Sequence, residues 1–361
     1  PNSSLYADQH PATPAVSPPA PGPQLLPTVT TAANANTATD LTTSTEPVIA
    51  ITALKVGQYL QFGRYCAPGY TMEDGSADIC WRILDVDQSS GKVLLLADRI
   101  LDIKPFDVAE SGLFNKDRDG NTYDRDQLAS YSQEALVQFR GNSDWETSNI
   151  RVWLNSDTEQ VTYTGQPPIS KGTDDACNGY HNQAGFLSAF TPREKALIAA
   201  QLNTTPVNAL NQTARLSGNQ VFKLNRNILK TDYNFNDTLS KTTLDKVFLL
   251  SLAEVKKYLY DRKFSIFALP TPAALRSDKS TWTKAYRAAG INNYLWVLRT
   301  PDGTTSHLVC IVGTGKNEHY AIDAKYAAAA GLGIRPAMSV KLKGIKLTGN
   351  GSETEPYRLM K

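Results

Sequence analysis

The order in which strand-like and helix-like segments follow one another limits the folds that this chain can adopt. Three early runs carry the pattern of half-buried or buried strands: Val56–Tyr65, Cys80–Asp87 and Gly91–Leu101. Strand-like runs return near the end of the chain, at Asn293–Thr300, Ser306–Thr314 and Gly333–Leu342. Helix-like segments lie between the two groups. This order indicates an α+β fold with antiparallel sheets, because a parallel fold would alternate strands and helices.

The helix-like segments begin at residues that cap helices well. In Phe190–Leu202, the Thr191 hydroxyl and the Glu194 carboxylate have the spacing of a capping box. Ser251 and Glu254 have the same spacing in a later segment. We therefore expect a few capped helices that accompany the sheets.

The first part of the chain has a composition that does not support a packed core. Residues 1–49 are rich in Pro, Ala, Thr, Ser and Asn, and prolines gather between Pro11 and Pro27. Such a segment buries too little apolar surface to offset the entropy lost on ordering. We expect a disordered tail or stalk over residues 1–49 and a globular α+β domain over residues 50–361. A stalk of this kind is typical of an exported domain held away from a cell envelope.

The charge balance argues against two classes of partner. The chain has 37 Lys and Arg residues against 35 Asp and Glu residues, a net charge of +2, and no basic run. Binding to nucleic acid normally requires a clustered basic surface. No apolar stretch reaches the roughly 18 residues that a membrane helix needs. We expect no nucleic-acid partner and no transmembrane segment.

Four cysteines, an even number, suit a compartment in which disulfides form. Cys66 and Cys80 flank the loop between two strand-like runs, and this spacing predicts a disulfide across a hairpin. Closing a loop of about 15 residues contributes on the order of 3 kcal/mol in the chain-entropy model. By elimination, Cys177 would pair with Cys310. The alternative for each cysteine is a buried thiol.

The segment Asn115–Asp126 has the spacing of a twelve-residue calcium loop. The predicted ligands are Asn115, Asp117, Asp119, Asn121 and Asp126. Gly120 occupies the position at which such a loop turns sharply. Thr122 departs from the pattern, since an aliphatic residue is usual there. The alternative is a solvated turn, and calcium is the one cofactor that the chain suggests.

Aromatic residues are the candidate ligand-binding residues, because aromatic faces stack well on sugars and peptides. The candidates are Trp145, Trp282, Tyr294 and Tyr320. Core packing is the alternative for such residues. Arg151, Arg299 and Arg335 stand beside apolar residues, and we interpret them as structural, forming buried forks to carboxylates. His307 and His319 flank a strand pair, and we expect both to be satisfied surface histidines; a metal or catalytic pair is the alternative.

Several motifs of the chain resemble a family of exported bacterial proteins that is known only as a domain of unknown function. The motifs are QFGRY (Gln61–Tyr65), WETSNIRVWLN (Trp145–Asn155), FLLSLAE (Phe248–Glu254), WVLRTP (Trp296–Pro301) and GIRPA (Gly333–Ala337). The resemblance spans Val56 to Leu359 and implies export and a bacterial origin, but no activity. The C-terminal half is also similar to C-type-lectin-like and formylglycine-generating-enzyme-like domains, which implies a domain whose loops form a binding surface.

These observations favour a non-enzymatic extracellular or cell-surface module for binding, adhesion or assembly, with a glycan or a protein as its ligand. Two alternatives stay open. One is a secreted hydrolase or oxidoreductase whose catalytic residues are scattered along the chain. The other is a structural subunit of an oligomer or filament, whose tail adds as a strand to a neighbour. Paired carboxylates in a deep cleft would favour the enzyme, and a shallow aromatic surface would favour the binding module.

Overall fold

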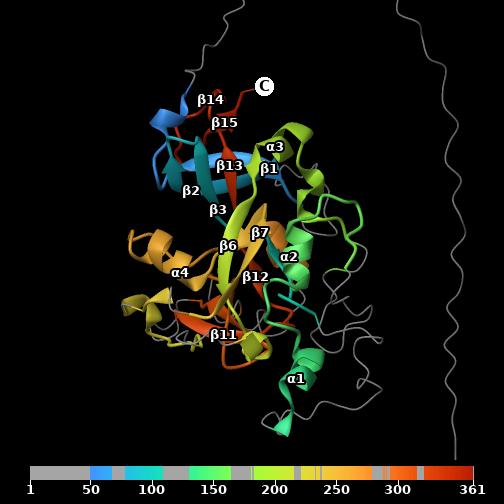
Figure 1. Cartoon of the computed structure of the whole chain (residues 1–361). Helices are drawn as coiled ribbons and strands as arrows, with labels where there is room; N and C mark the ends of the chain where they lie inside the picture. Colours follow the sequence, from blue (N-terminus) through green and yellow to red (C-terminus); the bar gives the residue numbers. More distant parts are fainter. Residues whose placement is uncertain are drawn as a thin grey trace, which may run out of the picture. The chain divides into compact units, whose positions relative to one another are not determined.

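The computed structural model describes residues 49–66, 78–108, 130–163, 180, 183–214, 221–231, 233–235, 238–278, 288, 290, 293–314 and 321–360 (Figure 1). Within these residues the chain forms two larger sheets, two short ribbons and several short helices. Helices are few and most strand pairs are antiparallel, so the predicted α+β class is confirmed. The predicted tail over residues 1–49 lies almost wholly outside the described residues, and the boundary at residue 49 stays a prediction.

The first sheet has six strands and begins with the predicted meander. β1, β2 and β3 pair antiparallel in sequence order, and β13 joins β3 from the other end of the chain. β5 and β8 both pair with β13. The strands are β1 (Tyr59–Arg64), β2 (Asp78–Asp87), β3 (Lys92–Ala97), β5 (Ile198–Ala199), β8 (Val247–Leu249) and β13 (Pro336–Lys341). All of β3 except Lys92 is buried, so this strand lies in the core.

The second sheet has five strands in the order β11-β10-β9-β12-β4. Its strands are β4 (Asp102–Ile103), β9 (Trp296–Pro301), β10 (Leu308–Val312), β11 (Ile322–Tyr326) and β12 (Gly333–Ile334). Only β12 and β9 run parallel, and they meet where Gly333 stands beside Trp296. Every residue of β9 is buried, which makes it the counterpart of β3.

One buried side chain holds two connections between the sheets together. The chain passes from β3 to β4 after Ala97, and from β12 to β13 through Arg335. The Arg335 Nε donates a hydrogen bond of 2.8 Å to the Ala97 carbonyl oxygen. Its guanidinium carbon lies 5.1 Å from the centroid of the Trp296 ring, a cation–π distance. Arg335 is therefore structural, but the predicted fork to a carboxylate is wrong: its contacts are one backbone carbonyl oxygen and an aromatic ring.

Two ribbons and the helices complete the described fold. The ribbons are β6 (Gln201–Pro206) with β7 (Ser240–Asp245), and β14 (Leu347–Thr348) with β15 (Arg358–Leu359). The α-helices are α1 (Gln133–Arg140), α2 (Asn149–Leu154), α3 (Pro192–Leu197), α4 (Leu252–Val255) and α5 (Pro272–Ser277). α4 continues into a π-helical turn, Lys256–Tyr260, and the 3₁₀ turns are Ile51–Ala53, Phe186–Ala189, Ala209–Ala214 and Ile228–Lys230. In the described part of the chain, no helix has the length and apolar character to cross a membrane.

Both predicted capping boxes are confirmed, in α3 and in α4. The helix predicted over Phe190–Leu202 nevertheless ends at Leu197, earlier than expected. The cause is tertiary, because Ile198 and Ala199 pair with the edge of β13. Those sheet hydrogen bonds, together with burial of Ile198, replace the last helical turns.

The motif Trp145–Asn155 anchors the junction between β7 and β8. The Asp245 carboxylate, which is 1% exposed, accepts hydrogen bonds from Trp145 Nε1 at 3.1 Å and from Arg151 Nε at 2.6 Å. Asn203 and Thr243 donate to the same carboxylate at 2.9 and 2.7 Å. A buried carboxylate with four donors is well satisfied. The motif therefore serves packing, and Arg151 has the structural role that the sequence predicts.

Arg299 forms the fork to a carboxylate that the sequence predicts. Its two terminal nitrogens lie 2.5 and 2.9 Å from the two carboxylate oxygens of Glu254, which also closes the α4 capping box. The same guanidinium donates to the Leu249 carbonyl oxygen at 2.6 Å and to the Thr205 hydroxyl at 3.0 Å. The Arg299 side chain is only 2% exposed. One arginine thus links β9, α4, β8 and β6.

We predict that Arg299→Leu lowers the free energy of unfolding by about 3 kcal/mol, because it leaves the Glu254 carboxylate without its buried partner. Arg226→Gln is the control, since Arg226 pairs with Asp323 at the surface, with exposed fractions of 57% and 31%. The control should change stability by less than about 1 kcal/mol. Urea denaturation measures both. Equal effects of the two variants would contradict the structural role of Arg299.

Candidate functional site

Most of the predicted site residues lie outside the described residues. These are the calcium loop Asn115–Asp126, the cysteine Cys177, the aromatic residues Trp282 and Tyr320, and His319. Among the residues that the structure describes, no three His, Cys, Asp or Glu side chains gather as a metal site would require. Calcium binding by Asn115–Asp126 stays a prediction.

The two described aromatic candidates belong to the core, so their predicted place on a ligand-binding surface is wrong. Trp145 is 1% exposed, and its ring nitrogen is engaged by Asp245. Tyr294 is 3% exposed, and its hydroxyl donates to Asp278 at 3.3 Å. A ring stacks on a sugar only where its face is open to solvent. The sequence does not distinguish the two cases, since large aromatic rings favour both settings.

The predicted Cys66–Cys80 disulfide is wrong, and the pairing of β1 with β2 gives the reason. Gln61 stands opposite Cys80 in the ladder. Arg64 stands opposite Asp78, so Cys66 and Cys80 each lie two residues beyond that pair, in opposite directions. Four residues of extended chain span roughly 13 Å, whereas a disulfide requires Cα atoms about 4.4–6.8 Å apart. Cys310 is also not part of a disulfide: it is a fully buried thiol whose sulfur lies 3.8 Å from the Pro301 carbonyl oxygen. No disulfide links the residues described.

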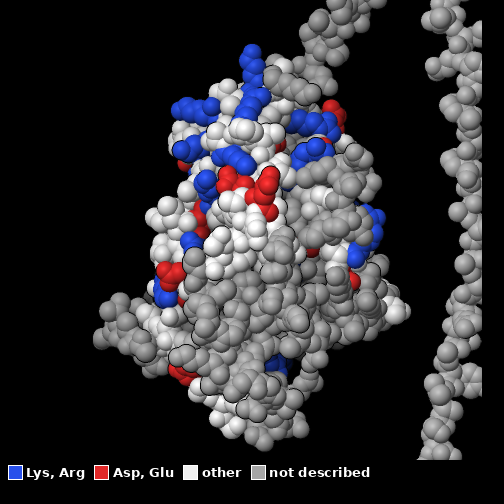
Figure 2. Space-filling view, turned by 90° about the vertical axis from the view of Figure 1, so that its right-hand side faces the viewer, with Lys and Arg blue, Asp and Glu red and all other residues white. Residues whose placement is uncertain are grey.

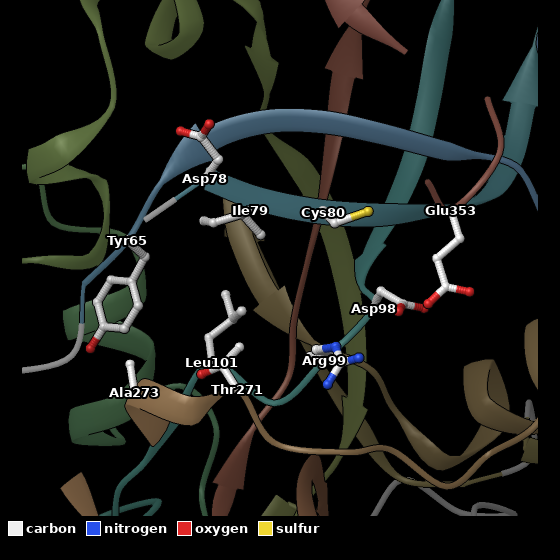
Figure 3. Close-up of a pocket in the computed structure, with 10 residues that line it drawn as sticks. All are labelled: Tyr65, Asp78, Ile79, Cys80, Asp98, Arg99, Leu101, Thr271, Ala273 and Glu353. Atoms are coloured by element: carbon white, nitrogen blue, oxygen red, sulfur yellow. The ribbon is translucent and has the colours of Figure 1, made fainter. Parts of the chain in front are cut away.

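A cleft of about 330 Å³ opens beside the edge of the first sheet (Figure 3). Its walls come from β2, from the connection after β3, from the start of α5 and from the β14–β15 loop. The lining residues are Tyr65, Asp78, Ile79, Cys80, Asp98, Arg99, Leu101, Thr271, Ala273 and Glu353. Segments far apart in the sequence thus meet at one place, as is usual for a small-molecule or peptide site.

The two ends of the cleft differ in chemical character. Figure 3 shows the side chains of Asp98, Arg99 and Glu353 gathered at the end near Cys80. Ala273 lies toward the opposite end, beside Tyr65, which is anchored there by its hydroxyl. Asp78 lies on the Tyr65 side, where Arg64 pairs with it, so the unpaired charges of the lining gather at the end near Cys80.

The tyrosine wall is held rigid by a buried cluster of charges. The Tyr65 hydroxyl donates to the Asp102 carboxylate at 2.5 Å, and Lys104 Nζ lies 3.2 Å from the same oxygen. The Ser277 hydroxyl donates to the other oxygen at 3.0 Å. Burial, followed by the nearby Asp102 charge, raises the pKa of Tyr65 well above its usual value. Tyr65 is thus a fixed, neutral part of the wall.

Two of the four charged side chains in the cleft are already paired with arginines. Asp78 lies 3.1 Å from Arg64, and Asp98 lies 3.2 Å from Arg82. Arg99 and Glu353 are both exposed and make no ion pair or hydrogen bond within the described residues. These two opposite charges are therefore available to a ligand.

Cys80 is the one residue in the lining whose thiol could act as a nucleophile. Burial, followed by the nearby carboxylates of Asp98 and Glu353, raises the pKa of this thiol to about 11. Arg82 and Arg99 oppose this effect but do not overcome it. A reactive cysteine requires a lowered pKa, because the thiolate is the attacking form. Cys80 thus remains a neutral thiol near pH 7.

The sequence did not point to this cleft. Asp98 and Arg99 follow the end of β3, and Glu353 lies in the last loop of the chain. None stands in a recognised catalytic or binding motif. The sequence offers one signal for Asp98 and Arg99: they are charged residues directly after a buried strand, and such residues often lie at the rim of a site.

His307 lies away from the cleft and is 8% exposed. Burial, followed by the positive charge of Arg140, lowers its pKa from 6.5 to about 4, and Asp302 offsets part of this. Its Nδ1 has no hydrogen-bond partner within the described part of the chain. The residue is a buried neutral histidine rather than the polar surface residue that we expect from the sequence.

We predict that His307 makes stability depend on pH. As the pH falls below 6.5, the unfolded chain binds a proton that the folded chain takes up only near pH 4. Stability from this group is complete above pH 6.5 and falls toward pH 4, by on the order of 1 kcal/mol per pH unit. Thermal melts of the wild type and of His307→Gln measure it. The variant should show a flatter profile, and an unchanged slope would contradict the assignment.

We predict that Cys80 reacts slowly with iodoacetamide at pH 8, because little of it is thiolate. Glu353→Gln removes a negative charge that disfavours the thiolate, so it should speed the reaction roughly two- to threefold. Peptide mapping by mass spectrometry assigns the label to Cys80. The exposed Glu159→Gln is the control and should leave the rate unchanged. Fast labelling of the wild type would show that the thiol is activated.

A family model places the chain among known sequences. The model described as "Domain of unknown function (DUF6273)" matches residues 90–342, which is more than half of the 361-residue chain. No curated protein and no solved structure gave a match to this chain. The similarity to an uncharacterised family is thereby confirmed, while export, bacterial origin and lectin-like character stay predictions. The chain belongs to the DUF6273 family, a domain of unknown function.

Proposed function

We propose that this protein is a non-enzymatic binding module outside the cell, and that the cleft beside β2 is its ligand site. The observation that carries the proposal is the cleft itself, which joins apolar lining residues to two unpaired charges at the end near Cys80. Binding sites commonly combine an apolar surface with a few polar groups that orient the ligand. The expected ligand is a glycan or a protein segment, presented at the surface of a cell.

The chemistry of the lining favours binding over catalysis. Cys80 stays protonated near neutral pH, and the Tyr65 hydroxyl already donates a hydrogen bond to Asp102. Asp98 is engaged by Arg82, so it is poorly placed to transfer a proton. A secreted hydrolase or oxidoreductase would need an activated group among these residues. The groups in the lining instead resemble fixed contacts.

The surface charge suits a protein or glycan ligand better than a polyanion. Figure 2 shows Lys and Arg together with Asp and Glu on the visible face of the described residues. Side chains of both signs lie among one another there. The near-neutral net charge of +2 agrees with this distribution. Such a surface lacks the uniform positive field that attracts nucleic acid.

A second candidate function, assembly with neighbouring copies, is favoured by the β6–β7 ribbon. Leu202 and Leu244 stand opposite each other in the ribbon and are 70% and 61% exposed. Thr204 and Thr242 form the next exposed pair on the same face. This strip carries apolar and uncharged residues at the surface. Surfaces of this kind often contact another protein.

We predict that the labelled protein binds members of an array of oligosaccharides and peptides through the cleft. The double variant Arg99→Gln/Glu353→Gln should weaken that binding roughly tenfold, since it removes both unpaired charges. Lys223→Gln/Glu159→Gln changes two exposed charges outside the cleft and is the control. Biolayer interferometry measures the affinities.

The same experiment separates the two candidate functions. Binding that survives the cleft variant but is lost in Leu202→Ser/Leu244→Ser would support assembly through the ribbon and would refute the cleft as the site. Turnover of any arrayed ligand, seen as a new mass, would refute a purely binding role.

A further inference from the structure

Two of the four charged side chains that line the cleft are paired with arginines and two are not, within the described residues. The unpaired charges indicate which charged groups a ligand should carry. Asp78 and Asp98 each lie within an ion pair, with Arg64 and Arg82. A ligand would have to compete with those arginines to use either carboxylate. Asp98 is held in a partly buried pair, and Asp78, although more exposed, also accepts a hydrogen bond from Gln61, so both carboxylates are already engaged.

Glu353 and Arg99 differ from Asp78 and Asp98 in their lack of an ion-pair partner. Both side chains are exposed, and neither has an ion-pair partner within the described residues. Figure 3 shows both at the same end of the cleft, close to Cys80. Both charges influence the pKa of the Cys80 thiol, so both lie within electrostatic range of its sulfur. Complementary charges on a ligand would give it orientation and selectivity.

The rest of the lining limits the size and polarity of the ligand. Ile79 and Leu101 are 2% and 7% exposed and face the cleft from two different strands or connections. They provide an apolar floor beside the two charges. A volume of about 330 Å³ lies at the low end of the range for ligand sites, which is roughly 300–1,000 Å³. The cleft therefore accepts a unit of one or two residues rather than a long chain.

We propose that the cleft binds a short apolar peptide with both ends free, of dipeptide size, as a zwitterion. Its ammonium group pairs with Glu353, its carboxylate pairs with Arg99, and its apolar side chains contact Ile79 and Leu101. A ligand with one charge leaves either Glu353 or Arg99 without a partner. This inference rests on the proposed binding function and specifies the ligand of the same site.

Isothermal titration calorimetry on the full chain tests the proposal with four matched probes. Leu-Leu carries both charges, acetyl-Leu-Leu lacks the ammonium group, Leu-Leu-amide lacks the carboxylate, and acetyl-Leu-Leu-amide lacks both. We expect Leu-Leu to bind best, and loss of either charge to weaken binding on the order of fivefold. A neutral trisaccharide serves as the glycan probe.

Two variants assign each charge to its residue. In Glu353→Gln, blocking the ammonium group should cost no further affinity, while blocking the carboxylate still should. In Arg99→Gln the pattern should be reversed. A merely structural role for either residue would weaken all four probes together. The control Lys223→Gln/Glu159→Gln should bind the probes like the wild type.

The outcomes distinguish this inference from the proposed function. Equal binding of all four probes, or preference for a singly charged probe, overturns the zwitterion assignment. Binding of the trisaccharide in a manner that depends on Arg99 or Glu353, without binding of Leu-Leu, also overturns it but preserves the cleft as a binding site. Failure of every probe in calorimetry, together with failure of the array experiment, refutes both.

Discussion

A buried guanidinium, that of Arg335, stands at the point on which the arrangement of the two sheets depends. It fills the single residue between β12 and β13 and donates to the last carbonyl oxygen of β3. Burial lowers its pKa to about 10, so it keeps its positive charge near pH 7. The cost of burying the charge is offset in part by the carbonyl oxygen and the Trp296 ring. The side chain thereby fixes where both chain connections leave the first sheet.

The position of two cleft residues depends on the contact between Arg335 and Ala97. Asp98 and Arg99 come directly after the carbonyl group that Arg335 holds, so their backbone is positioned by a core contact. Tyr65 is similarly held by Asp102, the first residue of β4. Rigid elements thus position exposed side chains, which is a common design for binding sites. Glu353 completes the lining from the last loop, which packs near β1 through Tyr357.

The motifs that are most distinctive in the sequence serve packing rather than binding. Arg151 and Trp145 both contact Asp245, and Arg299 contacts Glu254. These side chains join elements that are far apart along the chain, and each is largely withdrawn from solvent. Asp98 and Arg99, which line the cleft, instead follow the end of β3 and lie outside those motifs. Motif strength and exposure to a ligand are therefore separate properties in this domain.

Local patterns predicted much of the architecture, because short-range physics decides them. Period-two alternation marked the strands of the meander, and the Thr191 and Ser251 capping boxes form as expected. Non-local contacts decided the rest. The helix over Phe190–Leu202 stops where the edge of β13 is available, and the register of β1 with β2 places Gln61, not Cys66, opposite Cys80.

The amino-acid sequence by itself determined the fold class, the helix starts and the structural role of the arginines, since these depend on residue type and short spacing. Only the tertiary structure decided which aromatic rings are buried, which cysteines can meet and which charges remain unpaired. Trp145 and Arg99 illustrate the difference. Their neighbours in the sequence do not show that the Trp145 ring is buried rather than exposed, or that the Arg99 charge is unpaired rather than paired. Burial and pairing depend on residues distant in the chain. Such residues become neighbours only in the folded protein, as Arg335 and Ala97 do.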